Sequence, residues 1–156
     1  MSTVHRGQDA PGVGKPAAEH HSSRAATQTI WAGRSLVLIG SVHLVIFVVQ
    51  AAALGHLTDW LTGGLLSVET LEAELSQSQS YFWLSIGSSA VPMALLGLLI
   101  IRMGRAKELV PGYLLGGLTV WTLVCCLLLE PSGFPLLLVP VILLFLARRA
   151  THEKPA

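Results

Sequence analysis

Long apolar segments alternate with polar ones over most of the chain. The apolar segments lie at residues 30–54, 81–101, 111–129 and 132–147. A membrane core about 30 Å thick is crossed by roughly 20 apolar residues in a helix that rises 1.5 Å per residue. The first three segments reach or approach that length. The fourth gives only about 24 Å of helix, so we expect either that the bilayer is locally thinner there or that the helix begins below the membrane surface. The pattern predicts an all-α protein, a four-helix transmembrane bundle.

Three prolines bear on the shape of these helices. Pro92 and Pro140 lie inside the second and fourth segments, where a proline ring removes a hydrogen-bond donor and crowds the carbonyl four residues earlier. We therefore expect a kink at each of them. Pro111 opens the third segment, where a proline in the first helical turn is tolerated.

The polar segment at residues 55–80 is acidic and contains no Lys or Arg. Gly63 and Gly64 weaken any helix near the start of this segment. The pattern therefore predicts a short amphipathic helix at about residues 67–76, on the outward-facing surface of the membrane. The apolar side chains of this segment recur at helical steps, at Leu61, Leu65, Val68, Leu71 and Leu75. Aromatic side chains of the kind that favour the headgroup level flank it, at Trp60, Tyr81, Phe82 and Trp83.

The two ends of the chain lie outside the apolar segments. Residues 1–29 are rich in Gly, Pro, Ala, Ser and His without apolar periodicity, which predicts a disordered cytoplasmic tail, and residues 149–156 form a second short tail. Ala51, Ala52 and Ala53 resemble a signal-peptidase site, and cleavage there would leave three spans. We favour the uncleaved form, because the apolar run exceeds the roughly 7–15 residues of a signal-peptide core.

Composition and charge indicate where the protein lies. Hydrophobic residues make up 52% of the 156 residues and charged residues 12%, so lipid is the expected environment. Because basic segments are retained in the cytoplasm, we expect a multi-pass membrane protein with both termini in the cytoplasm. The net charge of +1 gives no reason to expect a nucleic-acid partner. The ten basic residues form three groups: Arg6, Lys15, Arg24 and Arg34; Arg102, Arg105 and Lys107; and Arg148, Arg149 and Lys154.

Small and polar residues mark the faces on which helices pack in a membrane. Because the segments alternate in direction, His43 falls near the midplane and most other polar positions fall in the outer half. This placement predicts a polar vestibule open to the outside, with Glu130 near its mouth and His43 at its floor. Helical spacing groups the residues as Gly33, Gly40, His43 and Gln50; Ser85, Ser88, Ser89 and Pro92; and Gly112, Gly116, Thr119, Leu123, Cys126 and Glu130.

Each of these positions also has a purely structural interpretation. An ionisable residue inside a membrane is a candidate for proton or ligand binding, but His43 equally suits a hydrogen bond between helices, which we favour. Glu130 lies at a helix end and is more typical of an interfacial residue than of an acid or base. Gly112 and Gly116 form a GxxxG pair, for which internal packing is favoured over homodimerisation.

No pattern in the sequence indicates a reaction. Cys125 and Cys126 are adjacent within an apolar run, which indicates neither a disulfide framework nor a CxxC site. No second histidine lies in any apolar segment, so we expect no metal and no cofactor. The chain contains no HExxH or GxSxG motif. We therefore predict no enzymatic activity.

Four short motifs, in their order and spacing, resemble those of an uncharacterised family of small four-span bacterial membrane proteins. The resemblance covers residues 29–148, implies a four-helix membrane domain with a short external helix, and contributes no activity. In layout the chain is also similar, more distantly, to DoxX-like four-span proteins. The motifs are Trp31-Ala32-Gly33-Arg34, Gly40-x-x-His43, Phe82-Trp83 and Pro131-Ser132-Gly133-Phe134.

Two classes of function are compatible with these features. A non-catalytic protein that binds, stabilises or regulates another membrane protein suits the small size and the absence of a paired acid and base. The alternative is a small transporter or proton-coupled carrier that uses the vestibule at His43, although the first segment lacks the carboxylate on which small multidrug transporters rely. A lipid-modifying enzyme is a weaker third option.

Overall fold

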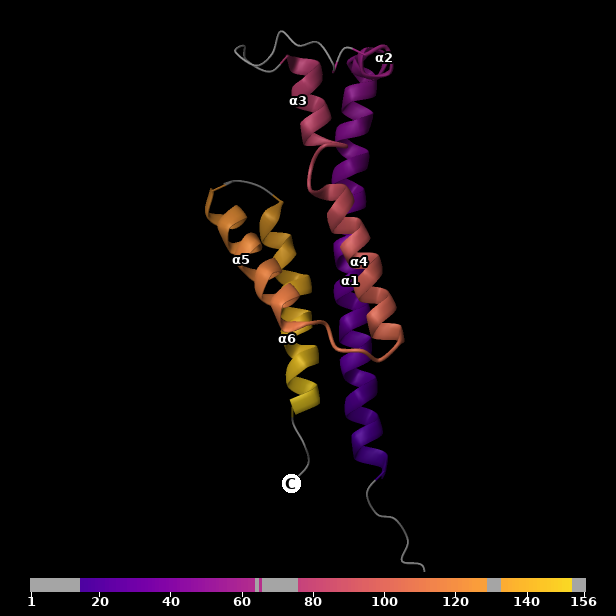
Figure 1. Cartoon of the computed structure of the whole chain (residues 1–156), viewed down its shortest axis with the longest axis vertical. Coiled ribbons are helices and arrows are strands. Elements are labelled where there is room, and N and C mark those ends of the chain that lie inside the picture. Colours follow the sequence, from indigo (N-terminus) through magenta and orange to yellow (C-terminus); the bar gives the residue numbers. More distant parts are fainter. Residues whose placement is uncertain (1–14, 64, 66–75, 129–132, 153–156) are drawn as a thin grey trace, which may run out of the picture.

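The computed structural model describes residues 15–63, 65, 76–128 and 133–152 (Figure 1). These residues form six α-helices and no strand, which confirms the predicted all-α class. In chain order the elements are α1 (Lys15–Ala53), α2 (His56–Leu61), α3 (Gln77–Leu84), α4 (Ala90–Arg105), α5 (Gly112–Leu128), the 3-10 helix η3 (Phe134–Leu137) and α6 (Leu138–His152).

Helix α1 is 39 residues long and begins at Lys15. The prediction of a disordered tail is therefore wrong for residues 15–29, and the rest of that tail lies outside the described part of the chain. Tertiary packing supports the helix where apolar periodicity is missing, because Ala26 lies against Gly104 of α4. The hydroxyl of the buried Thr29 donates to a carbonyl four residues back, at 2.9 Å, so its burial leaves no unpaired group.

The second apolar segment folds as two helices, α3 and α4, separated by a break at residues 85–89. The prediction of one helix with a kink at Pro92 is therefore wrong. Pro92 is the third residue of α4, a position where the backbone nitrogen needs no partner within the helix. The first regular turn closes just after it, where Met93 N donates to Ser89 O at 2.9 Å.

The third and fourth apolar segments form a hairpin of α5 with η3 and α6 (Figure 1). Helix α5 begins at Gly112, one residue after the predicted start, so Pro111 lies just before the helix and not within its first turn. The connection at residues 129–132 lies outside the described residues and includes Glu130. Helix α6 continues to His152, so the predicted tail at residues 149–156 begins as a helix. Pro140 lies three residues into α6, shortly after the chain changes from 3-10 to α geometry.

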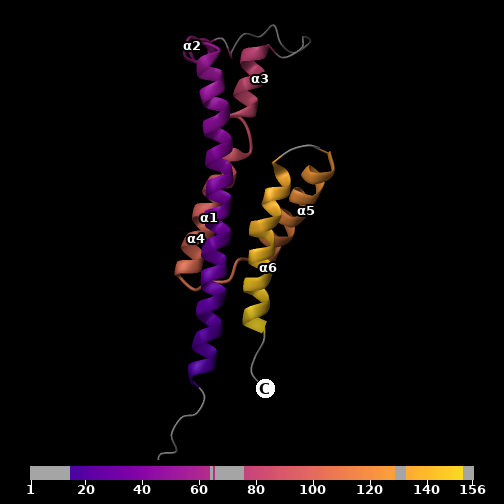
Figure 2. The same ribbon diagram turned by 180° about the vertical axis from the view of Figure 1, so that it is seen from behind.

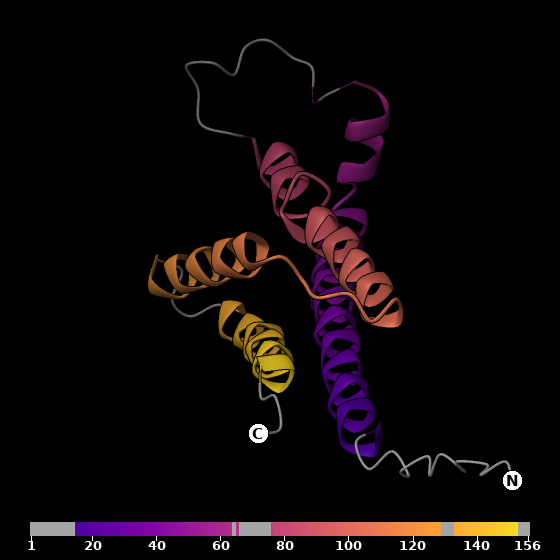
Figure 3. The same ribbon diagram turned by 60° about the horizontal axis from the view of Figure 1, so that its bottom comes forward.

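The long helices form an open row in the order α4, α1, α6, α5. Helix α1 packs against both α4 and α6, while α5 packs against α6 and η3. Figure 2 shows α6 between α1 and α5, and Figure 3 shows the α5–α6 hairpin standing apart from α4. The row has two free edges, whereas a closed four-helix bundle has none. Its core joins the helices at Leu36, Ile100, Leu115, Leu118, Leu137, Val141 and Leu144.

Helices α1 and α4 run antiparallel and approach closely at small residues. A Cβ atom added at Gly33 would lie 2.6 Å from the carbonyl oxygen of Gly97, and one added at Gly97 would lie 2.6 Å from that of Gly33. Such distances leave no room for a side chain on either helix. The contacts repeat every seven residues along both helices, where Ala26 faces Gly104, Gly33 faces Gly97 and Gly40 faces Ala90.

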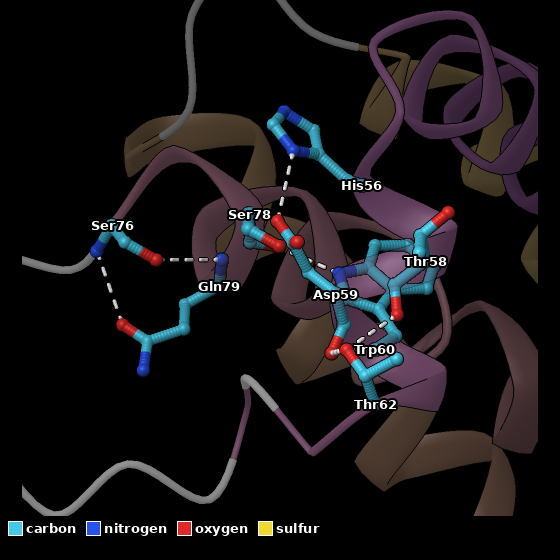
Figure 4. A network of polar contacts seen from close by, with 8 residues as sticks. All are labelled: His56, Thr58, Asp59, Trp60, Thr62, Ser76, Ser78 and Gln79. Atoms are coloured by element: carbon cyan, nitrogen blue, oxygen red, sulfur yellow. Dashed lines mark hydrogen bonds and ion pairs between the residues drawn. The ribbon is translucent and has the colours of Figure 1, made fainter.

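The short helix α2 holds α3 in place at the end of the molecule opposite the start of α1 (Figure 1). The indole Nε1 of Trp60 donates to Ser78 O at 3.1 Å, and the start of α3 is closed by a capping box between Ser76 and Gln79 (Figure 4). The predicted amphipathic helix at residues 67–76 falls almost wholly outside the described residues. Within residues 55–80 the structure shows α2 and the start of α3.

Candidate functional site

Serine side chains satisfy the backbone groups that the break between α3 and α4 exposes. The hydroxyl of the fully buried Ser85 donates to Tyr81 O at 2.6 Å. The hydroxyl of Ser88 donates to Ser85 O at 2.6 Å and accepts from Ala90 N at 3.1 Å. These bonds supply partners to backbone groups that a continuous helix would otherwise satisfy.

Gly87 makes the break compact. Its N–H donates to Phe82 O at 2.9 Å, which folds the chain back over the end of α3. A Cβ atom at this position would lie 2.7 Å from the Trp83 ring. Only glycine therefore fits without displacement of the aromatic side chains.

His43 connects α1 to the end of α3. Its Nε2 lies 2.9 Å from the carbonyl oxygen of Leu84. A carbonyl oxygen only accepts, so Nε2 carries the hydrogen and donates it. The ring also packs on Phe47, with 4.7 Å between the ring centroids. His43 thus donates to the carbonyl of the last residue of α3, and the carbonyl groups at the end of a helix have no N–H donor within the helix itself.

A groove of about 430 Å³ lies beside this hydrogen bond. It is bounded by α1, by the start of α4 and by η3. Its lining is largely apolar, and its polar side chains are His43 and Ser89. The residues that line it are Ile39, Val42, His43, Ile46, Phe47, Ser89, Ala90, Met93, Gly133, Phe134, Leu136 and Leu137.

The structure brings only part of the predicted vestibule together. His43 and Ser89 share the groove, whereas Ser85 and Ser88 serve the backbone of the break. Gln50 is exposed on α1 and does not line the groove. Two further residues lie on α5, away from this lining: Thr119, whose hydroxyl donates to Leu115 O at 2.7 Å, and the half-buried Cys126. Glu130 lies outside the described residues.

The four glycines predicted to pack helices have different surroundings. Gly33 and Gly40 lie in the contact between α1 and α4. Gly112 lies beneath the guanidinium group of Arg148, whose nearest nitrogen is 2.7 Å from the Cβ position. Gly116 has no atom within 4 Å of its Cβ position. The GxxxG pair of α5 is therefore not a helix contact within the described residues.

The basic ends of α4 and α6 lie level with the first half of α1, because Gly104 packs against Ala26 and Ile30 and because Arg148 and Thr29 line one small cavity. Arg102, Arg105 and Lys107 are exposed at the end of α4, and Arg149 is exposed near the end of α6 (Figure 1). Arg34 is exposed on α1, and its guanidinium carbon lies 5.0 Å from the centre of the Trp31 ring.

Sequence reasoning missed the glycines on α4 and the role of the Leu84 carbonyl. Gly97 and Gly104 are seven residues apart, as are Gly33 and Gly40, and this matched spacing is a signal that could have predicted the pairing of the two helices. The Leu84 carbonyl gives no signal in a sequence. Among the described residues, no three His, Cys, Asp or Glu side chains gather where they could hold a metal ion.

These observations define an all-helical protein in which two helices, Ser23–Ala53 and Phe134–Thr151, are long and apolar enough to cross a membrane. The chain belongs to a family of unknown function, DUF6463, whose match extends over residues 27–151. This result confirms the predicted membership of an uncharacterised family and assigns no activity. The similarity to DoxX-like proteins stays a prediction. No curated protein and no solved structure matches the chain.

Proposed function

We propose that this protein is a four-span protein of the bacterial inner membrane that has no catalytic activity and binds another membrane protein. The spans would be α1, the α3–α4 pair, α5, and η3 with α6. Large apolar side chains cover the outside of all the long helices, which suits lipid and is unfavourable in water. Examples that are 55% to 63% exposed are Leu38, Val45, Leu95, Val120 and Ile142.

The distribution of basic residues supports a topology with both termini in the cytoplasm. Gly104, next to Arg105, packs against Ile30 of α1, and Arg148 lines a small cavity together with Thr29. The basic ends of α4 and α6 are therefore level with the same part of α1. In a chain without its native cysteines, Gly133→Cys should react with an impermeant thiol reagent from outside the cell, and Ala106→Cys only after lysis; the reverse pattern contradicts the topology.

The free edge of the helix row at α5 is the observation that carries the proposed binding role. Helix α5 buries Leu115, Leu118 and Thr122, and its described contacts are with α6 and η3. The opposite side presents Gly116 and Gly117, which have nothing within 4 Å of their Cβ positions. Small residues at such a surface allow the backbone of another membrane helix to approach closely.

A pair of crosslinking variants tests this surface. A photoreactive amino acid at Val120 of α5, which is 63% exposed, should give one discrete crosslinked product in native membranes. The matched control is the same amino acid at Leu95 of α4, which is 61% exposed and should give none. A product of twice the chain mass would identify the partner as a second copy. Identical behaviour at the two positions would refute a binding surface on α5.

A specific observation favours the carrier as a second candidate. The break between α3 and α4 lies beside His43, and interrupted helices commonly border the substrate sites of secondary transporters. His43→Gln separates a carrier role from a structural one, because the glutamine amide can donate to Leu84 O but cannot take up a proton. A pH-dependent flux in proteoliposomes that disappears in this folded variant would support a carrier, and an unchanged flux would exclude His43 from proton coupling.

A further inference from the structure

The groove beside His43 has the size and lining of a site for a small apolar molecule. Its volume of about 430 Å³ falls within the range of roughly 300–1,000 Å³ that is typical of ligand sites. Ile39, Met93 and Leu137 line its inner side from three different elements. Val42 and Ile46 line it as well and are 47% and 48% exposed, so a ligand can reach the groove along α1.

Two polar groups can bind a ligand in this apolar groove. Nε2 of His43 is engaged by Leu84 O, which leaves Nδ1 as the acceptor of the neutral ring. Ser89 is the N-cap residue of α4, and its hydroxyl makes no capping hydrogen bond to that helix. Both residues line the same groove, and an acceptor nitrogen together with a hydroxyl group offers the two kinds of partner that a ligand hydroxyl group needs.

The charge of the lining selects against ionised ligands. None of the described residues that line the groove is Lys, Arg, Asp or Glu. A phosphate or carboxylate group placed there would lose its hydration without gaining a cation, which is strongly unfavourable. An uncharged hydroxyl group has no such penalty once it is hydrogen-bonded.

We propose that the groove binds an uncharged lipid that carries a free hydroxyl group, with diacylglycerols and long-chain alcohols as the chemical class. The hydrocarbon chain would contact Ile39, Met93 and Leu137, and the hydroxyl group would donate to Nδ1 of His43 and accept from Ser89. This site is separate from the proposed partner surface on α5, so either proposal can be refuted without affecting the other.

Photolabelling of the purified full-length chain in lipid nanodiscs tests the proposal. The probe is a diacylglycerol with a diazirine in one acyl chain, compared with the same probe acetylated on its hydroxyl group and with the corresponding phosphatidic acid. We expect labelling in α1 and α4 next to the groove, several-fold stronger for the free alcohol than for either comparison probe, because each hydrogen bond contributes about 1 kcal/mol.

Three variants locate the binding within the groove. Val42→Trp fills it from its exposed side and should abolish specific labelling, while Val45→Trp, three positions along α1 and outside the lining, should leave labelling unchanged. Ser89→Ala removes one hydroxyl group and keeps the backbone carbonyl that Met93 uses. It should weaken labelling by about three- to tenfold, and far-UV circular dichroism should be the same in all three variants.

The outcomes are decisive in both directions. Equal labelling by the free and acetylated probes, stronger labelling by phosphatidic acid, or equal labelling of Val42→Trp and Val45→Trp would each overturn the proposal. If Val42→Trp does not fold, the Ser89→Ala result decides alone, and unchanged hydroxyl selectivity in that variant refutes the site. Loss of the Val120 crosslink with intact labelling would refute only the partner surface.

Discussion

Substitution of Gly33 by alanine should force α1 and α4 apart. The new methyl group would lie 2.6 Å from the carbonyl oxygen of Gly97, where ordinary contacts begin at 3.4 Å, so the helices must separate locally by about 0.8 Å. The carbonyl oxygen is a backbone atom, so it cannot move away by a change of rotamer as a side chain can. Overpacking of this kind costs about 1–3 kcal/mol in the free energy of unfolding, which corresponds to about 5- to 150-fold in the unfolding equilibrium.

Gly117→Ala is the matched control for this substitution. Both variants gain the helix propensity of alanine, worth up to about 1 kcal/mol, but nothing lies within 4 Å of the Cβ position of Gly117. The difference between the two variants therefore isolates the packing cost. Reversible unfolding in mixed micelles, followed by far-UV circular dichroism, measures both. Equal stability of the two variants would refute the close approach of α1 and α4.

Substitutions at three further positions test the supports of α3 and the core. In detergent micelles, His43→Ala should speed amide hydrogen exchange in the 85–89 break while His43→Gln keeps it slow; equal exchange rates would argue against the hydrogen bond to Leu84 O. Ser76→Ala removes the capping box with Gln79 and should lower the stability of α3 by about 0.5–2 kcal/mol, seen as faster amide exchange within α3 and not in α4. Thr122→Val removes a buried hydroxyl group that has no partner among the residues that the structure describes and should raise the free energy of unfolding by about 1 kcal/mol or more; a destabilised variant would show that the hydroxyl group is paired.

Hydrophobic patterning predicted the parts of the fold that local composition determines. The apolar runs gave the location of α5 and of η3 with α6, and α5 begins within one residue of the predicted start at Pro111. The N-terminal extension of α1 could not be predicted in this way. Its residues lack apolar periodicity, and the helix there is supported by packing of Ala26 against Gly104, far away in the sequence.

The candidate site was predictable only in its individual residues. His43 stood out as the histidine of an apolar segment, but its partner is a backbone carbonyl, which every residue possesses. Ser85 and Ser88 matched the spacing of a helical face, yet the structure uses them to close a break in the helix. The same side chains suit either arrangement, because a serine hydroxyl can serve its own backbone as readily as a neighbouring helix.

The seven-residue repeat of small residues between α1 and α4 constrains how the chain can change in length. One residue inserted between Ala90 and Gly97 would rotate one of these two residues by about 100° relative to the residue that it faces on α1. A bulkier side chain would then take the place of the alanine or the glycine in that contact. An insertion in the connection at residues 107–111 would leave the rotational phase of both helices intact. Relatives of this chain should therefore vary in length at such connections, and keep a constant residue count from Ala90 to Gly104.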